Sequence, residues 1–228
     1  MTRTTNARIA GLTYLVYIAT AFPAMVMFDR ATSAEGIAAK IAGIAEHATD
    51  VRITVVLSVL NGFMALILAV TLYAITRDED RDIALLGFAG RVGEGVNGAF
   101  FTLATLGLLW LGTAADAPDA AVTNALGAFF LKARVWNVLV GAISFAFGST
   151  MFCWLLLRGR MIPPPLAWLG VLSSVLLVVL LPLQLIGLFD RPVFALVWLP
   201  MAVFEIVVGV WFLIKGVGGS RTANGATA

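Results

Sequence analysis

The chain has 228 residues, of which 61% are hydrophobic and 12% are charged, and its mean hydropathy is +0.98. A soluble domain carries roughly twice that share of charged residues, so the composition excludes an ordinary soluble protein and predicts an outer surface that faces lipid. The formal net charge is only +2, which excludes the strongly basic surface that nucleic-acid binding requires.

Six stretches are long and apolar enough to cross a membrane, because a span needs about 20 apolar residues. In chain order they run from Ile9 to Phe28, Ile53 to Ile75, Ile83 to Leu111, Val135 to Leu157, Leu166 to Leu188 and Val193 to Ile214. We therefore predict an all-α fold, a six-helix transmembrane bundle that forms a single domain over residues 1–216. A flexible C-terminal tail is expected over residues 217–228, where Gly, Ser, Thr and Ala offer little to bury.

The connection between the first and second spans predicts a short helix of its own. Thr32-Ser33-Ala34-Glu35 has the spacing of a capping box, which starts a helix. Ile37, Ile41 and Ile44 then fall on one helical face. We expect an amphipathic helix that lies on the outer surface of this membrane or over the mouth of the helix bundle.

Lys and Arg residues near the ends of the spans indicate the orientation, because cytoplasmic loops carry an excess of them. Eight fall on the side of the termini: Arg3, Arg8, Arg77, Arg81, Arg158, Arg160, Lys215 and Arg221. Six fall on the other side: Arg30, Lys40, Arg52, Lys132, Arg134 and Arg191. The excess predicts that both termini are cytoplasmic.

Three charged residues lie inside the spans, where charge is costly and needs a partner, a wet cavity or a function. With a rise of about 1.5 Å per residue, Arg91 lies about 12 Å and Glu94 about 16 Å from the cytoplasmic end at Ile83. Glu205, in the sixth span, lies about 15 Å from Lys215. The three side chains therefore share a level near the middle of the bilayer, and we expect them to form one cluster.

Polar and small residues recur at helical spacing in the second, third and fourth spans, which predicts three faces that share a common interior. We take the polar members Asn61, Asn97 and Ser144 as further candidate residues of that interior.

Two interpretations of this interior stay open. In one, Arg91 is neutralised by Glu94 and Glu205, and the cluster only fixes how the helices pack. In the other, the cluster is a polar pocket for a small solute, an ion or a lipid headgroup. Its formal charge is −1, so a bound proton or cation would balance it, or one glutamate is protonated because burial disfavours the charged form.

Several chemistries are excluded by the residues present. The chain has one cysteine, Cys153, and one histidine, His47, so it forms no internal disulfide, no bis-histidine haem and no His-Glu-x-x-His zinc site. No phosphate-binding Gly-rich loop and no Gly-x-Ser-x-Gly elbow occurs. We therefore expect no cofactor and no metal, and no nucleophile–base pair indicates an enzyme.

The order of these features resembles the bacterial multi-pass membrane proteins grouped as the domain of unknown function 4386. The shared pieces are Ala7-Arg8-Ile-Ala-Gly-Leu-Thr-Tyr14, the Ala-rich stretch from Ile37 to His47 before Arg52, Arg91-Val-Gly-Glu94, and Leu199-Pro200-Met-Ala-Val-Phe-Glu205 followed by Trp211-Phe-Leu-Ile-Lys-Gly216. The resemblance implies a six-helix protein of the bacterial inner membrane and implies no reaction. Many relatives would carry a histidine in the fourth span, where this chain has Ser144, Phe147 and Gly148.

The sequence favours the binding or transport of a small solute or amphipathic molecule in the polar interior. The alternative is an accessory or scaffold subunit of a larger membrane complex, in which the charged cluster is purely structural. The expected partners are membrane lipids, a small-molecule ligand, and a second copy or a larger membrane complex, with no nucleic acid.

Overall fold

The computed structural model describes residues 1–116, 118–188 and 191–218, and within them the fold is all-helical. The helices are α1 (Arg3–Ala31), α2 (Ile37–Glu46), α3 (Ala48–Thr76), α4 (Arg81–Thr113), α5 (Ala120–Arg158), α6 (Pro164–Leu185) and α7 (Arg191–Ile214). Six of them, all but α2, are long and apolar enough to cross a membrane, and the qualifying part of α7 is Leu196–Ile214. The predicted fold class is confirmed.

The six long helices form a ring. In the order α1, α3, α4, α5, α6, α7 and back to α1, each packs against the next. Among the described residues, no Cα atom of α4 lies within 8 Å of a Cα atom of α1 or α7. Helix α4 therefore meets α1 and α7 across the ring only through side chains.

Glycines let neighbouring helices of the ring approach closely. A Cβ atom on Gly90 of α4 would lie 2.7 Å from the Cα of Gly148 of α5. A Cβ atom on Gly11 of α1 would lie within 3 Å of the backbone of α7 at Gly209. We call these two interfaces the α4–α5 seam and the α1–α7 seam. Each depends on the absence of a side chain at its closest point.

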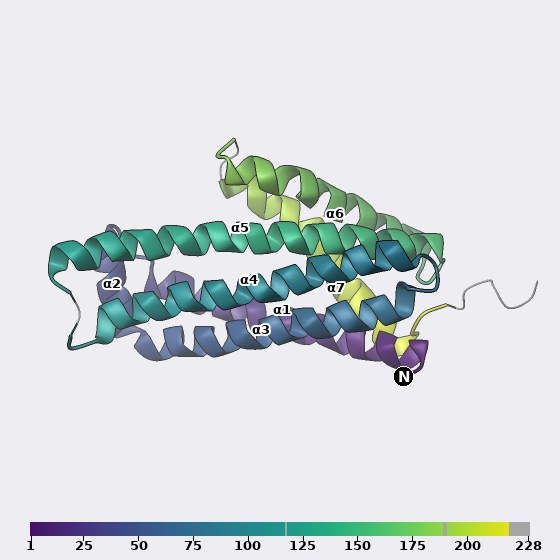
Figure 1. Cartoon of the computed structure of the whole chain (residues 1–228), viewed down its shortest axis with the longest axis horizontal. Helices are drawn as coiled ribbons and strands as arrows, with labels where there is room; N and C mark the ends of the chain where they lie inside the picture. The colour runs from purple at the N-terminus through teal and green to yellow at the C-terminus, as the bar shows by residue number, and fades with distance from the viewer. Residues whose placement is uncertain (117, 189–190, 219–228) are drawn as a thin grey trace, which may run out of the picture.

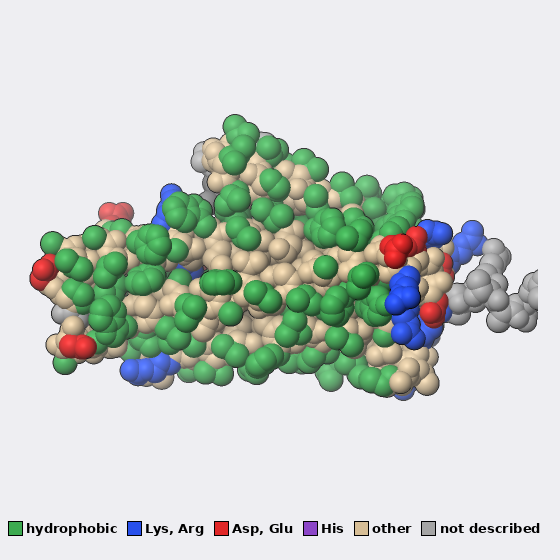
Figure 2. Space-filling view, viewed as in Figure 1, with side chains coloured by type: hydrophobic (Ala, Val, Ile, Leu, Met, Phe, Trp, Pro, Cys, Tyr) green, Lys and Arg blue, Asp and Glu red, His purple; other side chains and the backbone are tan. Residues whose placement is uncertain are grey.

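The start of α1 and the end of α7 mark one end of the molecule. The α3–α4 turn and the α5–α6 turn also lie at that end (Figure 1), and charged side chains gather there while hydrophobic side chains cover the flank (Figure 2). Val217 and Gly218, the first residues of the predicted tail, are described, and the Gly218 N–H donates a hydrogen bond to the Met161 carbonyl. Residues 219–228 of that tail lie outside the described residues.

The short helix α2 lies at the opposite end, beside the far ends of α4 and α5 (Figure 1). Its Ile44 is fully buried in a small apolar core with Phe28, Val51 and Leu108. Helix α2 contacts α1, α3, α4 and α5 and so lies across this end of the bundle, while its position at the membrane surface stays a prediction.

The expected start of this helix was wrong. No capping box forms at Thr32–Glu35: α2 begins after Gly36, whose φ of 83° is accessible to glycine, and it has no side-chain cap. The Thr32 and Ser33 hydroxyls instead donate to the carbonyls of Phe28 and Arg30 at the end of α1.

The fourth predicted span is also longer than expected. Helix α5 begins at Ala120, well before Val135, because Asp119 caps it by accepting hydrogen bonds from the Ala121 and Val122 N–H groups. The additional turns pack beside α2, where Gly127 meets the side chain of Ile41.

Candidate functional site

Arg91 occupies the centre of the ring with none of its surface exposed. Its Nη1 donates to Glu94 Oε2 at 2.9 Å, one turn further along α4. Its Nη2 donates to Glu205 Oε1 of α7 at 3.3 Å. The guanidinium therefore bridges two carboxylates from opposite sides of the ring, and the predicted three-residue cluster is present.

Two tyrosines of α1 complete the polar network. Tyr17 donates its hydroxyl proton to Glu94 Oε1 at 2.8 Å, so both oxygens of that carboxylate are hydrogen-bonded. The Tyr14 hydroxyl accepts from Arg91 Nη2 at 3.3 Å. Helix α4, which has no Cα atom within 8 Å of a Cα atom of α1 or α7 among the described residues, is thus joined to both helices by one set of hydrogen bonds.

Two aromatic rings lie against the guanidinium. The Arg91 Cζ lies 4.5 Å from the centre of the Phe145 ring of α5 and 5.6 Å from that of Tyr14. Such contacts favour a cation that has lost its water shell. Within the described residues, the Nε of Arg91 is buried and has no hydrogen-bond partner, so one donor of the cluster is free to bind an acceptor.

The two carboxylates lie at the edge of the cluster. The Glu94 side chain keeps 9% and the Glu205 side chain 10% of its surface exposed, against 1% for Arg91. With one cation and two carboxylates, the formal charge of the cluster is −1. Among the described residues, no three His, Cys, Asp or Glu side chains gather as a metal site would require.

Further polar side chains lie on the α2 side of the cluster. The Asn97 Oδ1 of α4 accepts from the Asn137 Nδ2 of α5 at 3.4 Å. The Thr20 hydroxyl of α1 donates to the Asn61 Oδ1 of α3 at 2.6 Å. All four residues are half-buried, whereas Arg91 is fully buried.

Arg134 of α5 is a second cation on the same side. Its Cζ lies 3.1 Å from the centre of the Phe28 ring and 4.3 Å from that of Phe101, which places it between α1 and α4. No carboxylate oxygen of the described residues lies within 4 Å of it. Aromatic faces therefore take the place of an ion-pair partner.

With this geometry established, comparison with known proteins identifies the family. A family model described as Domain of unknown function (DUF4386) matches residues 9–216. The chain belongs to this family. No curated protein and no solved structure matches it.

The predicted site residues of this DUF4386 chain lie in three places. Arg91, Glu94 and Glu205 form the cluster, and Asn61 and Asn97 belong to the polar pairs beyond it. Ser144 lies apart from the cluster, at the α4–α5 seam against Gly93. Its hydroxyl donates to the Val140 carbonyl of its own helix, a common alternative for serine in a helix interior.

Three contacting residues in this DUF4386 chain were not predicted from the sequence: Tyr14, Tyr17 and Phe145. A signal for the tyrosines was present, because two of the three tyrosines in the chain stand three residues apart in the first span. Counted from Arg8, they lie about 9 and 14 Å deep, close to the level of Arg91 and Glu94. Phe145 carried no comparable signal, since it is one of 15 phenylalanines in an apolar chain.

Proposed function

We propose that this protein binds a small solute or amphipathic molecule in the interior of its helix bundle, as a binding protein or a transporter of the bacterial cytoplasmic membrane. The proposal places Arg91, Glu94 and Glu205 at the polar centre of the binding site. One observation carries it: a charged network joins α4 to α1 and α7, although no Cα atom of α4 lies within 8 Å of a Cα atom of either helix among the described residues. Rearranged side chains in that region would leave room for a ligand.

The charges of the cluster indicate which ligand chemistry suits it. The carboxylates of Glu94 and Glu205 exceed the one guanidinium by one negative charge, so a cationic group or a proton would neutralise the site. The free Nε of Arg91 adds one hydrogen-bond donor for an acceptor atom of the ligand. A small molecule with an amine and a neighbouring oxygen would satisfy both groups.

The burial pattern favours entry from the α2 side. Towards the termini, the interior is filled by fully buried apolar side chains such as Ile75, Phe152 and Phe212. Towards α2, Asn97 and Asn137 are half-buried and polar. A ligand that enters from this side would have to pass the small apolar core under α2. The excess of Lys and Arg predicts cytoplasmic termini, and with that orientation a ligand would reach the cluster from the outer face of the membrane.

Thiol labelling tests whether water reaches this interior. In a Cys153→Ala background, Asn97→Cys and Asn137→Cys should react with a charged, membrane-impermeant maleimide added to intact cells. Val96→Cys is the matched control, because Val96 neighbours Asn97 but is 53% exposed on the apolar outer surface, where lipid would cover it. Ser149→Cys, buried at the α5 end nearer the termini, should also stay unlabelled.

A native mass spectrum of the purified protein then tests for the ligand itself. A bound small molecule should be lost when Glu205 is changed to Gln and kept when the exposed Glu35 is changed to Gln. If Asn97→Cys and Asn137→Cys react no faster than Val96→Cys, and no small molecule is bound, the binding proposal is wrong.

A second candidate function is that of an accessory or scaffold subunit. It is favoured by the complete burial of Arg91 and by the pairing of its Nη groups with two carboxylates and a tyrosine. Under this alternative, a triple Arg91→Met, Glu94→Leu and Glu205→Leu variant should fold and assemble normally, because apolar residues can replace a buried ion cluster. The same variant would abolish ligand binding under the first proposal.

A further inference from the structure

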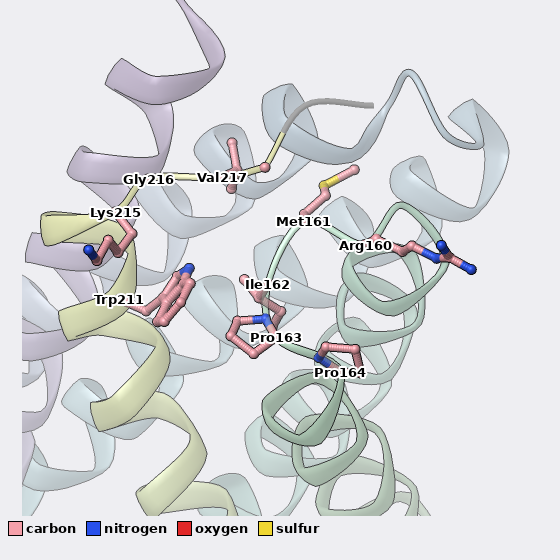
Figure 3. A pocket seen from close by; sticks show the side chains of 10 residues that line it. Arg160, Met161, Ile162, Pro163, Pro164, Trp211, Lys215, Gly216 and Val217 are labelled. Atoms are coloured by element: carbon pink, nitrogen blue, oxygen red, sulfur yellow. The ribbon is translucent and has the colours of Figure 1, made fainter. Parts of the chain in front are cut away.

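The described residues also form an open cavity of about 420 Å³ at the end of the molecule where α1 begins and α7 ends. It lies between the α5–α6 turn and the end of α7 (Figure 3), away from the Arg91 cluster. Among the residues that line it are Arg160, Pro163, Pro164, Trp211 and Lys215. The cavity is open to the outside, and it combines two cations with an apolar wall.

The backbone around the cavity has an unusual conformation. Arg160 has a φ of 48°, in the left-handed region that residues other than glycine seldom adopt. Gly216 has a φ of 68°, which turns the chain after α7 back across the α5–α6 turn. There the Gly218 N–H donates to the Met161 carbonyl at 2.9 Å and fixes the position of the turn. The cavity is thus formed by two connecting segments that are tied together.

The level of the cavity within the membrane follows from the helices that border it. Pro164 is the first residue of α6, and Lys215 directly follows the last residue of α7. Both helices are candidate spans, so the cavity lies where the hydrocarbon region meets the lipid headgroups. Trp211, one turn before Lys215, is the kind of side chain that prefers this level.

The charges of the lining suit an anion. Figure 3 shows Trp211, Ile162 and Pro163 beside the cavity, with the Arg160 and Lys215 side chains at opposite rims and their charged ends directed outward. Both cations are exposed, and neither has a carboxylate oxygen within 4 Å among the described residues. By contrast, neighbouring Arg158 pairs with Asp80 at 3.4 Å. Two free cations on long side chains are therefore available to close over a negative group.

We propose that this cavity binds the phosphate headgroup of an anionic phospholipid, with Arg160 and Lys215 on the phosphate and with Trp211 and Pro163 against the glycerol and first acyl carbons. A headgroup fits because the cavity opens at headgroup depth and combines cations with apolar rings. The site is independent of the proposed solute-binding function, since it shares no residue with the Arg91 cluster.

Native mass spectrometry with added lipid tests this site. The full chain in detergent is titrated with phosphatidylglycerol, with phosphatidylcholine and with inorganic phosphate. We expect phosphatidylglycerol to bind most tightly. An Arg160→Asn, Lys215→Gln variant should bind it at least about tenfold more weakly, because each cation near the membrane surface contributes to the attraction of anionic lipid. Asn is chosen at position 160 because it tolerates a positive φ.

The matched control removes two other cations at the same end. Arg77→Gln, Arg81→Gln changes the net charge equally, and both residues are exposed and lie outside the cavity. It should keep the affinity of the unchanged protein, and thermal unfolding should show that both variants are folded. If both double variants lose affinity equally, only general surface charge attracts the lipid and the site does not exist. Inorganic phosphate that binds as tightly as phosphatidylglycerol would overturn the assignment to a lipid.

Discussion

An arginine in the middle of a membrane span must replace its water shell with other polar groups, and Arg91 does so with residues from three helices. Its two Nη groups reach Glu94, Glu205 and Tyr14, while Phe145 lies against the guanidinium. Tyr17 also donates a hydrogen bond to Glu94, so the network contains neutral side chains as well as the charged ones. The loss of one member therefore leaves a buried charge without a partner, which costs far more than the net contribution of an intact pair.

We predict that Arg91→Ala destabilises the protein by about 3–5 kcal/mol, because it leaves two buried carboxylates without a cation. Glu205→Gln should have a smaller but clear effect, since Arg91 keeps Glu94. The single cysteine offers the measurement, because Cys153 is buried and a thiol-reactive dye would label it only on unfolding. Glu35→Gln, on the exposed α1–α2 connection, serves as the control. Equal melting temperatures for all three variants and the unchanged protein would show that the cluster contributes nothing to stability.

Counting residues from the ends of the spans predicted the charged cluster, but it did not predict the aromatic side chains around it. Arg91, Glu94 and Glu205 could be placed at one level because helical rise is constant and charges in spans are rare. The aromatic contacts of Arg91 and Arg134 depend on how helices rotate and pack, which a single apolar sequence does not specify.

At the scale of the helices, glycine determines which helices become neighbours. The α4–α5 seam brings Gly90 against Gly148, and the α1–α7 seam brings Gly11 against Gly209. Close approach of this kind contributes packing contacts, which must replace the hydrophobic effect between helices in lipid. These seams orient Arg91 of α4 and Glu205 of α7 towards each other across the ring.

Two glycines of the same helix should respond differently to alanine. Gly90→Ala should destabilise the protein by about 1–3 kcal/mol, because the added Cβ would lie 2.7 Å from backbone atoms of Gly148 and the helices must separate. Gly98→Ala should be neutral or stabilising, because its Cβ would make only an ordinary 3.8 Å contact and alanine favours a helix. Thermal unfolding followed through Cys153 measures both. A milder effect at Gly90 than at Gly98 would contradict the close seam.

The helices themselves were predictable to different degrees. All six spans were found from hydropathy, yet the first turns of α5 were missed because Lys132 and Arg134 interrupt the apolar stretch. The start of α2 was misplaced because Thr32 and Ser33 bind the end of the preceding helix instead of capping the next. Apolar length identifies a span well, whereas helix ends depend on local hydrogen bonds that several residues can satisfy.

At the scale of the whole molecule, the two ends of the ring differ. One end carries the start of α1, the end of α7 and the cavity beside Lys215, while α2 and its small apolar core cover the other. Between them, the half-buried polar pairs lie on the α2 side of the Arg91 cluster, and fully buried apolar side chains fill the other side. The orientation in the membrane therefore determines which compartment faces the polar side of the interior.

Reporter fusions test that orientation. A green fluorescent protein fused after residue 228 should fluoresce and an alkaline phosphatase fused there should be inactive, because the excess of Lys and Arg predicts a cytoplasmic C-terminus. The control is a phosphatase fused after Asp119 of the α4–α5 connection, which should be active. The reverse pattern would show the opposite orientation, in which the α2 end faces the cytoplasm and a ligand would enter from there.

The unequal length of the helices has a consequence for the surrounding bilayer. Helices α4 and α5 have 33 and 39 residues, or about 50 and 58 Å, while the 22 residues of α6 span about 33 Å, near the thickness of the hydrocarbon region. Leu106 and Trp110 stay exposed near the far end of α4, so one flank presents a taller apolar surface than the other. Lipids beside the tall flank must stretch, or the bundle must tilt, at a cost of fractions of a kcal/mol per Å. Two copies that meet along their tall flanks would remove part of that elastic cost from both.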